Sequence, residues 1–306
     1  MFKNGEVVCF FGDSITAAGS WEAEVFQHIR KHTDVRFYNC GISGGTAELA
    51  SEYLYSFCLS KNPDTVVLSF GANDIQRELY SMPETEEVKR KKAEQFLLFT
   101  EKMDFLISSI LSFGARVILF TPPPYDEFNE SREKNLYCQS AFSRAAEVIR
   151  NLSKKHDCLL IDIQKSFLSI IKEKRIMLPD RLHPTQLGYH FLAQCFLVGI
   201  NEIDEVSLTP IPPLEKWNQE RQSAEKIIKL LDFIDYRLLY RQAKERGWGT
   251  SEKIEECKRL LALEEDKTSY FAISFDAYIK HAVRREELTN ELVRLTVAKR
   301  QTTISE

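Results

Sequence analysis

Two short motifs carry the side chains of a serine nucleophile and of the base that would activate it. Ser14 follows Gly12 and Asp13, and His183 comes three residues after Asp180. A histidine can take the proton of a serine hydroxyl when a carboxylate holds its far ring nitrogen, and the three-residue spacing across a tight loop allows that contact. Each motif alone also fits a plainer interpretation, Ser14 as a helix cap or loop residue and Asp180 with His183 as an ordinary loop or surface pair.

Two further motifs contain hydrogen-bond donors. The turn at residues 39–46 contains three glycines, Gly44 among them, and its unshielded backbone N–H groups could hold an anion. Asn73 in the motif Gly-Ala-Asn-Asp provides a neutral amide, and acyl transfer requires such donors where a carbonyl oxygen becomes negative. A phosphate-binding loop is not indicated, because the turn has no lysine and the sequence has no G-x-x-x-x-G-K-[ST] motif. An ordinary turn after a strand remains the alternative for both motifs.

The elements that must position these motifs are short apolar runs separated by segments with helical periodicity. Nearly continuous apolar runs are typical of parallel strands that are buried on both faces, and they predict a doubly wound α/β sheet. Each motif lies just after a predicted strand or in the loop before the final helix, so we expect all four to meet in the crevice at the carboxyl ends of the strands. The predicted strands are Val7–Phe11, Val35–Asn39, Thr65–Phe70, Arg116–Phe120 and Leu159–Ile163.

The longest crossover helix has clear predicted ends. Ser81 and Glu84 have the spacing of a capping box, with Pro83 in the first turn, and apolar residues follow at helical intervals until Gly114. Further helices are expected at about Trp21 to His32, at about Leu136 to Lys155 and after Pro184.

The composition changes near residue 210, where a proline-rich stretch is followed by a segment rich in Glu, Lys, Arg, Leu and Ile. Apolar residues recur there at spacings of three and four, which predicts helices. The expected organisation is an α/β domain over 1–205, a linker over 206–213 and a helical extension over 214–306. Such an extension could pack on the sheet domain, cover the crevice or pair with another copy of the chain.

Length and composition exclude several classes of protein. The 306 residues are 43% hydrophobic, which is enough for a large core and rules out a disordered chain. A net charge of −4 argues against nucleic acid as a partner. No apolar run reaches the roughly 20 residues of a membrane span, and none resembles an export signal, so a cytoplasmic protein is expected. Seven scattered cysteines without C-x-x-C spacing predict reduced thiols and no zinc site.

Taken together, the four motifs resemble the ordered sequence blocks of the SGNH, or GDSL, hydrolases. The blocks are G-D-S with Ser14, the glycine turn with Gly44, G-x-N-D with Asn73, and D-x-x-H ending in His183. The resemblance covers roughly residues 5 to 200. It implies a flavodoxin-like sheet of strand order 2-1-3-4-5 and an ester hydrolase that needs no metal or other cofactor.

The resemblance also implies a role for each matching residue. Ser14 is the nucleophile, His183 the general base and acid, and Asp180 the carboxylate that orients it. The oxyanion hole would consist of the backbone N–H groups of Ser14 and Gly44 and the side-chain amide of Asn73. The neighbouring aspartates of the G-D-S and G-x-N-D motifs are taken as structural.

Substrate preference is expected to come from the loops at the strand ends. Pro123 and Tyr125, after the fourth predicted strand, and Trp21 could line an acyl or alcohol pocket, although stiffening of a turn and core packing are equally good interpretations. No long apolar lid precedes the site, which favours short acyl groups, such as acetyl esters on carbohydrates. Lysophospholipase, thioesterase and acyltransferase activities remain alternatives, as does a non-catalytic binding module whose helical extension meets a partner.

Overall fold

The computed structural model describes residues 2–128 and 138–212. The chain divides into two compact units, Met1–Glu52 with Asp64–Gln222 and Tyr53–Pro63 with Ser223–Glu306. The helical extension predicted for 214–306, and any pairing with another copy through it, lie outside the described residues. Residues 206–212, in the predicted linker, contain no helix or strand.

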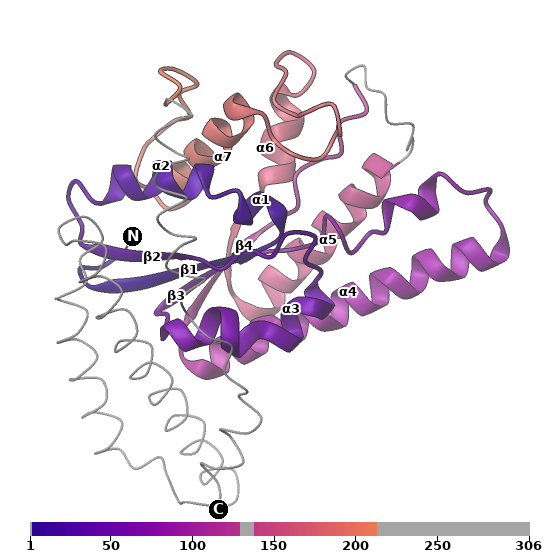
Figure 1. The fold of residues 1–306 in the computed structure, drawn as a ribbon, viewed down its shortest axis with the longest axis horizontal. Coiled ribbons are helices and arrows are strands. Elements are labelled where there is room, and N and C mark those ends of the chain that lie inside the picture. Colours follow the sequence, from indigo (N-terminus) through magenta and orange to yellow (C-terminus); the bar gives the residue numbers. More distant parts are fainter. Residues whose placement is uncertain (1, 129–137, 213–306) are drawn as a thin grey trace, which may run out of the picture. The chain divides into compact units, whose positions relative to one another are not determined.

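The first unit contains one sheet of five parallel strands in the order β2-β1-β3-β4-β5 (Figure 1). This order confirms the expected topology. In the register of the sheet, Phe10 of β1 lies opposite Asn39 of β2 on one side and Val67 of β3 on the other, so the carboxyl ends of these three strands are side by side. The strands are β1 (Glu6–Gly12), β2 (Val35–Asn39), β3 (Thr65–Ser69), β4 (Arg116–Phe120) and β5 (Leu159–Ile161).

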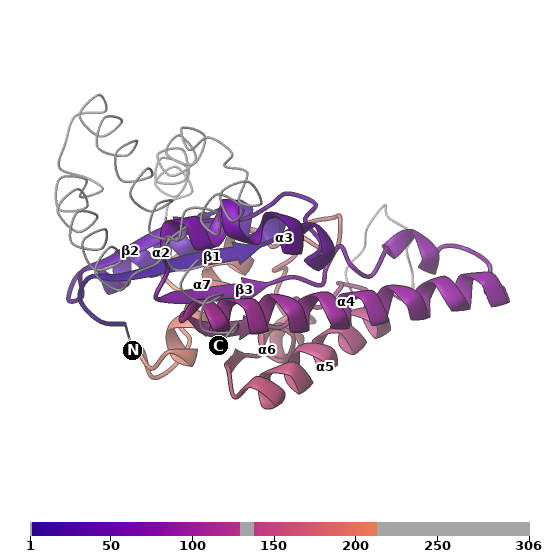
Figure 2. The same cartoon turned by 90° about the horizontal axis from the view of Figure 1, so that it is seen from below.

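The described helices are α1 (Ser14–Ala17), α2 (Ser20–Ile29), α3 (Ala47–Tyr53), α4 (Glu86–Phe113), α5 (Cys138–His156), α6 (Ile163–Ile170) and α7 (Gln186–Gly199). Three short segments of other helix types are η1 (Leu54–Cys58), η2 (Leu59–Lys61) and η3 (Arg77–Tyr80). In Figure 1, α2, α6 and α7 lie above the sheet and α4 and α5 below it, and Figure 2 shows α4 and α5 side by side. None of the helices in the described ranges combines the length and the apolar character needed to cross a bilayer.

An aromatic cluster fills the space between the sheet and the α2–α7 layer. The Trp21 ring of α2 lies 5.1 Å from Phe10, 5.2 Å from Phe120 and 5.6 Å from Phe196 of α7, measured between ring centroids. Burying one such side chain stabilises the fold by roughly 2–3 kcal/mol. These contacts explain the apolar side chains on the face of the sheet that α2 and α7 cover.

Two helix starts differ from the sequence prediction. Helix α4 is capped by Thr85, whose hydroxyl accepts a backbone hydrogen bond at 3.2 Å, so the predicted start at Ser81 is wrong. The two glutamates after Thr85 favour this start, because negative charge in the first turn complements the helix dipole. Helix α7 begins after Thr185, one residue beyond Pro184. Gly114 ends α4 as predicted, in a left-handed conformation with φ +103°.

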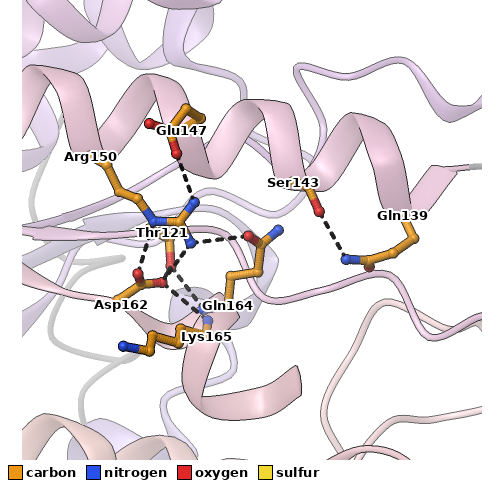
Figure 3. A network of polar contacts seen from close by, with 8 residues as sticks. All are labelled: Thr121, Gln139, Ser143, Glu147, Arg150, Asp162, Gln164 and Lys165. Carbon is orange, nitrogen blue, oxygen red and sulfur yellow. Dashed lines mark hydrogen bonds and ion pairs between the residues drawn. The ribbon is translucent and has the colours of Figure 1, made fainter. Parts of the chain in front are cut away.

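A polar network joins α5 to the ends of β4 and β5 (Figure 3). The Arg150 guanidinium donates from Nε and Nη2 to the two carboxylate oxygens of Asp162, at 2.9 and 3.0 Å, and from Nη2 to the Gln164 Oε1 at 3.1 Å. The Thr121 hydroxyl donates to Asp162 at 3.2 Å. Asp162 also caps α6, since its side chain accepts the N–H of Lys165. The Asp162 carboxylate thus connects α5, α6 and the loop after β4 at the carboxyl ends of the strands.

Candidate active site

The turn after β1 presents Ser14 at the first residue of α1. Gly12 allows this turn because a Cβ there would come within 2.3 Å of the Thr16 hydroxyl and 2.7 Å of the Ser69 carbonyl. Asp13 caps the short helix, accepting the N–H of Ile15 at 2.9 Å. The Ser14 side chain is partly exposed at the carboxyl edge of the sheet.

A chain of hydrogen bonds links Ser14 to the loop before α7. The Ser14 Oγ lies 2.8 Å from His183 Nε2, and His183 Nδ1 lies 2.5 Å from Asp180 Oδ2. A proton on Nδ1 is donated to the carboxylate, which leaves Nε2 to accept the serine hydroxyl. These are the contacts that a nucleophile, its base and an orienting acid require.

The environment of Asp180 favours the charged form of its carboxyl group. Partial burial acts to raise its pKa, but hydrogen bonds from the His183 ring and from the backbone N–H groups of His183 and Leu182 outweigh burial. The pKa of Asp180 therefore lies below its ordinary value. An ionised Asp180 is the form that stabilises a protonated imidazole.

Backbone contacts hold the glycine turn beside the serine loop. The N–H of Ile42 donates to the Gly12 carbonyl at 2.8 Å. Asn39 shapes the same turn, since its amide donates to the Thr16 carbonyl at 2.7 Å and its Oδ1 accepts the N–H of Gly41 at 2.9 Å. Sequence reasoning did not single out Asn39, although an Asn at a strand end directly before a glycine turn is a recognisable signal.

The predicted oxyanion donors lie on these neighbouring loops. Gly44 has φ +73°, a left-handed conformation that favours glycine, although a Cβ there would meet nothing within 4 Å. The Asn73 side-chain amide donates to the backbone carbonyl of Gly45, the residue after Gly44, at 3.0 Å. This bond joins the loop after β3 to the glycine turn. The joint action of Ser14, Gly44 and Asn73 as an oxyanion hole stays a prediction.

Two buried aspartates, Asp13 and Asp74, hold the loops of the site through hydrogen bonds to backbone N–H groups. Asp74 Oδ1 accepts the N–H of Ala47 at 2.8 Å, and Asp13 has the capping bond already described, so both tie a turn to backbone donors. Burial raises the pKa of Asp13 to about 6, and burial together with the charge of Asp13 raises the pKa of Asp74 to about 7. Asp74 Oδ2 is buried and has no hydrogen-bond partner among the described residues.

The three side chains predicted to line a substrate pocket are all buried. Trp21 is 1% exposed and packs in the aromatic core, which is the alternative that the sequence left open. Pro123 and Tyr125 are buried in the loop after β4, where the Tyr125 ring lies 5.5 Å from that of Phe142. A role of Pro123 and Tyr125 beside a substrate stays a prediction. Within the described ranges no group of three or more His, Cys, Asp or Glu side chains could hold a metal ion.

Comparisons with known proteins give matches to solved structures and to one family model. No curated protein matches the sequence. Among solved structures, a gut microbial diltiazem-metabolizing enzyme has a TM-score of 0.60 at 21% identity, and the match covers 66% of this chain and 48% of that one, so the chain spans about half of that enzyme. An acetylxylan esterase from Geobacillus stearothermophilus has a TM-score of 0.55 at 23% identity, covering 69% and 99%. An alpha/beta hydrolase from the metagenome of Lake Arreo, Spain, has a TM-score of 0.55 at 22% identity, covering 65% and 97%.

The matched sequence region contains nearly all of the α/β fold and both ends of the hydrogen-bond chain. The family model of the GDSL-like lipase/acylhydrolases matches residues 10–191, which include Ser14, Asn73, Asp180 and His183. The chain therefore belongs to the GDSL-like lipase/acylhydrolase family and is a carboxylic ester hydrolase.

Proposed function

We propose that this protein hydrolyses esters through an acyl-serine intermediate on Ser14. The observation that carries the proposal is the continuous hydrogen-bond chain from the Ser14 hydroxyl through the His183 ring to the Asp180 carboxylate, at 2.8 and 2.5 Å. Serine, histidine and carboxylate groups so connected can move a proton away from the hydroxyl while its oxygen attacks a carbonyl.

The proposed reaction has two halves. In the first, His183 Nε2 takes the Ser14 proton as Oγ bonds to the acyl carbon, and the protonated ring then gives that proton to the leaving alcohol oxygen. In the second, Nε2 takes a proton from water as the water oxygen attacks the acyl-serine, and it returns the proton to Ser14 Oγ when the carboxylic acid leaves. Asp180 remains ionised throughout.

Charge on the carbonyl oxygen is proposed to be stabilised by three donors. They are the backbone N–H groups of Ser14 and Gly44 and the side-chain amide of Asn73. Support comes from the strand order, which puts the ends of β1, β2 and β3 side by side, and from the bond between Asn73 and Gly45. Donors fixed before the reaction avoid the cost of reorienting solvent around the developing charge.

Short acyl esters, in particular acetyl groups on carbohydrates, are the proposed substrates. Support comes from the acetylxylan esterase among the similar structures and from the absence of a long apolar lid in the sequence before the site. A cytoplasmic location belongs to the same proposal, because seven scattered cysteines without C-x-x-C spacing are typical of the reduced thiols of that compartment.

The test compares the wild-type chain with Ser14→Ala. We expect a fluorophosphonate probe to label only the wild type, and p-nitrophenyl acetate to be hydrolysed only by the wild type. Acetylated xylo-oligosaccharides should be better substrates than p-nitrophenyl esters of long-chain acids. Equal inertness of both proteins would contradict the hydrolase mechanism, and a preference for long-chain esters would contradict the substrate class.

A further inference from the structure

Arg181 lies between the two residues of the acid–histidine pair and has a left-handed backbone. Its φ is +67°, a conformation that L side chains rarely adopt. Within this turn Asp180 folds back, so that its Oδ1 accepts the N–H groups of Leu182 and His183 at 3.0 Å each while its Oδ2 contacts the His183 ring. The acid–histidine contact therefore depends on a backbone turn that an arginine by itself disfavours.

Three hydrogen bonds hold this turn in place. The buried Arg181 side chain, 7% exposed, donates from Nη1 to the backbone carbonyl of Asp126 at 2.9 Å. In return the N–H of Asp126 donates to the Arg181 carbonyl at 2.9 Å, and the N–H of Arg181 donates to the Leu178 carbonyl at 2.9 Å. Since Asp126 follows the buried prolines after β4, the acid–histidine loop is fastened to a second loop at the edge of the sheet.

The burial of the Arg181 guanidinium favours a structural role for its hydrogen bond to the Asp126 carbonyl. A buried cation is costly unless acceptors compensate for the loss of water. Among the described residues, the Arg181 side chain has one hydrogen-bond acceptor, the backbone carbonyl of Asp126, and its Nε atom has no acceptor. Disfavoured backbone conformations persist where the surroundings impose them, and they are concentrated at functional sites.

We propose that Arg181 is a positioning residue, whose bond to the Asp126 carbonyl fixes the geometry between Asp180 and His183 and so sets the reactivity of Ser14. The inference rests on the proposed function, because it concerns the same three reacting side chains. Arg181 itself makes no contact with the reacting atoms and acts through the loop.

Three substitutions at position 181 test the hydrogen bond. Arg181→Lys keeps a cationic donor for the Asp126 carbonyl, whereas Arg181→Met keeps a long side chain and removes the donor. Arg181→Gly removes the anchor from a backbone that accepts positive φ freely. Asp157→Gly is the matched control, since it relieves another left-handed residue, φ +51°, at an exposed position after α5.

The readouts are the rate of fluorophosphonate labelling from pH 5 to 9 and the melting temperature of each variant. We expect the Met and Gly variants to be labelled about tenfold more slowly at neutral pH, and the Lys variant within about threefold of the wild type. The shape of the pH profile should change in the two slow variants and not in the Lys variant, because the contact between Asp180 Oδ2 and the His183 ring depends on the loop that Arg181 holds. Asp180 and Asp13 are the carboxylates whose charges act on His183, and Asp13 is unchanged in every variant.

The outcomes separate this inference from the proposed function. If the wild type is labelled no faster than Ser14→Ala, the proposed function fails. If the wild type is labelled and the folded Met and Gly variants match its rate and pH profile, the positioning role is overturned. Should the Met variant not fold, the Gly variant decides the result by the same criterion.

Discussion

At the residue scale, the Asn73 side-chain amide has two N–H bonds, and we propose a different role for each. One bond goes to the Gly45 carbonyl at 3.0 Å and fixes the plane of the amide, and the other has no acceptor among the described residues and can serve a substrate oxygen. We expect Asn73→Ala to lower kcat for p-nitrophenyl acetate by about 10²–10³. The melting temperature should change by only a few degrees, because one part-buried hydrogen bond is lost.

The control for this prediction is a variant that lowers the stability of the fold but leaves the proposed oxyanion donors in place. Thr85→Ala removes the cap of α4 and should lower the melting temperature without a comparable loss of kcat. A kcat for Asn73→Ala within about threefold of the wild type would contradict the role of Asn73 as an oxyanion donor.

The residue types of the site could be predicted from sequence, but the contacts that hold them could not. Serine, aspartate and histidine in short motifs at strand ends suggested Ser14, Asp180 and His183, because the chemistry needs those groups. Arg181 gave no such signal, since an arginine in a loop is usually solvated and nothing in its neighbours reveals a φ of +67°. Trp21 shows the converse, because a large aromatic side chain at the start of a helix fits a pocket or a core equally well.

At the element scale, strands were easier to predict than helix ends. The five strands agree with their apolar runs to within two residues at either end, because a strand that is buried on both faces needs apolar side chains at nearly every position. The start of α4 was misplaced by a competing cap, Ser81 against Thr85, which have similar capping chemistry. The helices α1 and α6, with four and eight residues, are too short to give a clear periodicity.

Asp162 gives the prediction that belongs to this scale. Its carboxylate caps α6 and binds the Arg150 guanidinium through two oxygens, so Asp162→Ala removes a cap and leaves the arginine without its main partner. We expect the free energy of unfolding to fall by about 2 kcal/mol, measured by urea denaturation. The matched control is Glu147→Ala, which removes the more exposed partner of the same arginine and should cost a few tenths of a kcal/mol. Equal losses for the two variants would contradict the role assigned to Asp162.

At the scale of the whole molecule, the sheet order explains how four short motifs far apart in the sequence meet at one edge. A parallel sheet with β1 between β2 and β3 puts the loops after these three strands in adjacent positions, and the chain returns with the acid–histidine loop before α7. This much was predictable, because apolar strand runs and crossover lengths restrict the topology. The fold of residues 214–306 was predicted only as helical, since helical periodicity shows which faces are apolar but not what they pack against.

The buried carboxyl group of Asp74 makes the stability of the whole domain depend on pH. Its pKa is raised from 3.8 to about 7, first by burial and then by the charge of Asp13, so between these values the folded protein holds a proton that the unfolded chain has released. Stability from this group is fully present below pH 3.8 and is lost as the pH rises to about 7. Asp74→Asn keeps an oxygen for the Ala47 N–H and has no proton to lose. We therefore expect the free energy of unfolding of Asp74→Asn, relative to that of the wild type, to increase by roughly 2–4 kcal/mol from pH 4 to pH 8.

Urea denaturation at a series of pH values measures this gain. Other carboxylates, Asp180 among them, have lowered pKa values and change stability in the opposite direction, so the difference between the two proteins is the informative quantity. Asp204→Asn, at an exposed carboxylate, should differ from the wild type by a constant amount over the same range. Parallel curves for Asp74→Asn and the wild type would show that the buried carboxyl group ionises as easily in the folded protein as in the unfolded chain. In that case Asp74 would be charged next to Asn73, a proposed oxyanion donor, where a negative charge opposes the one that develops in the proposed reaction.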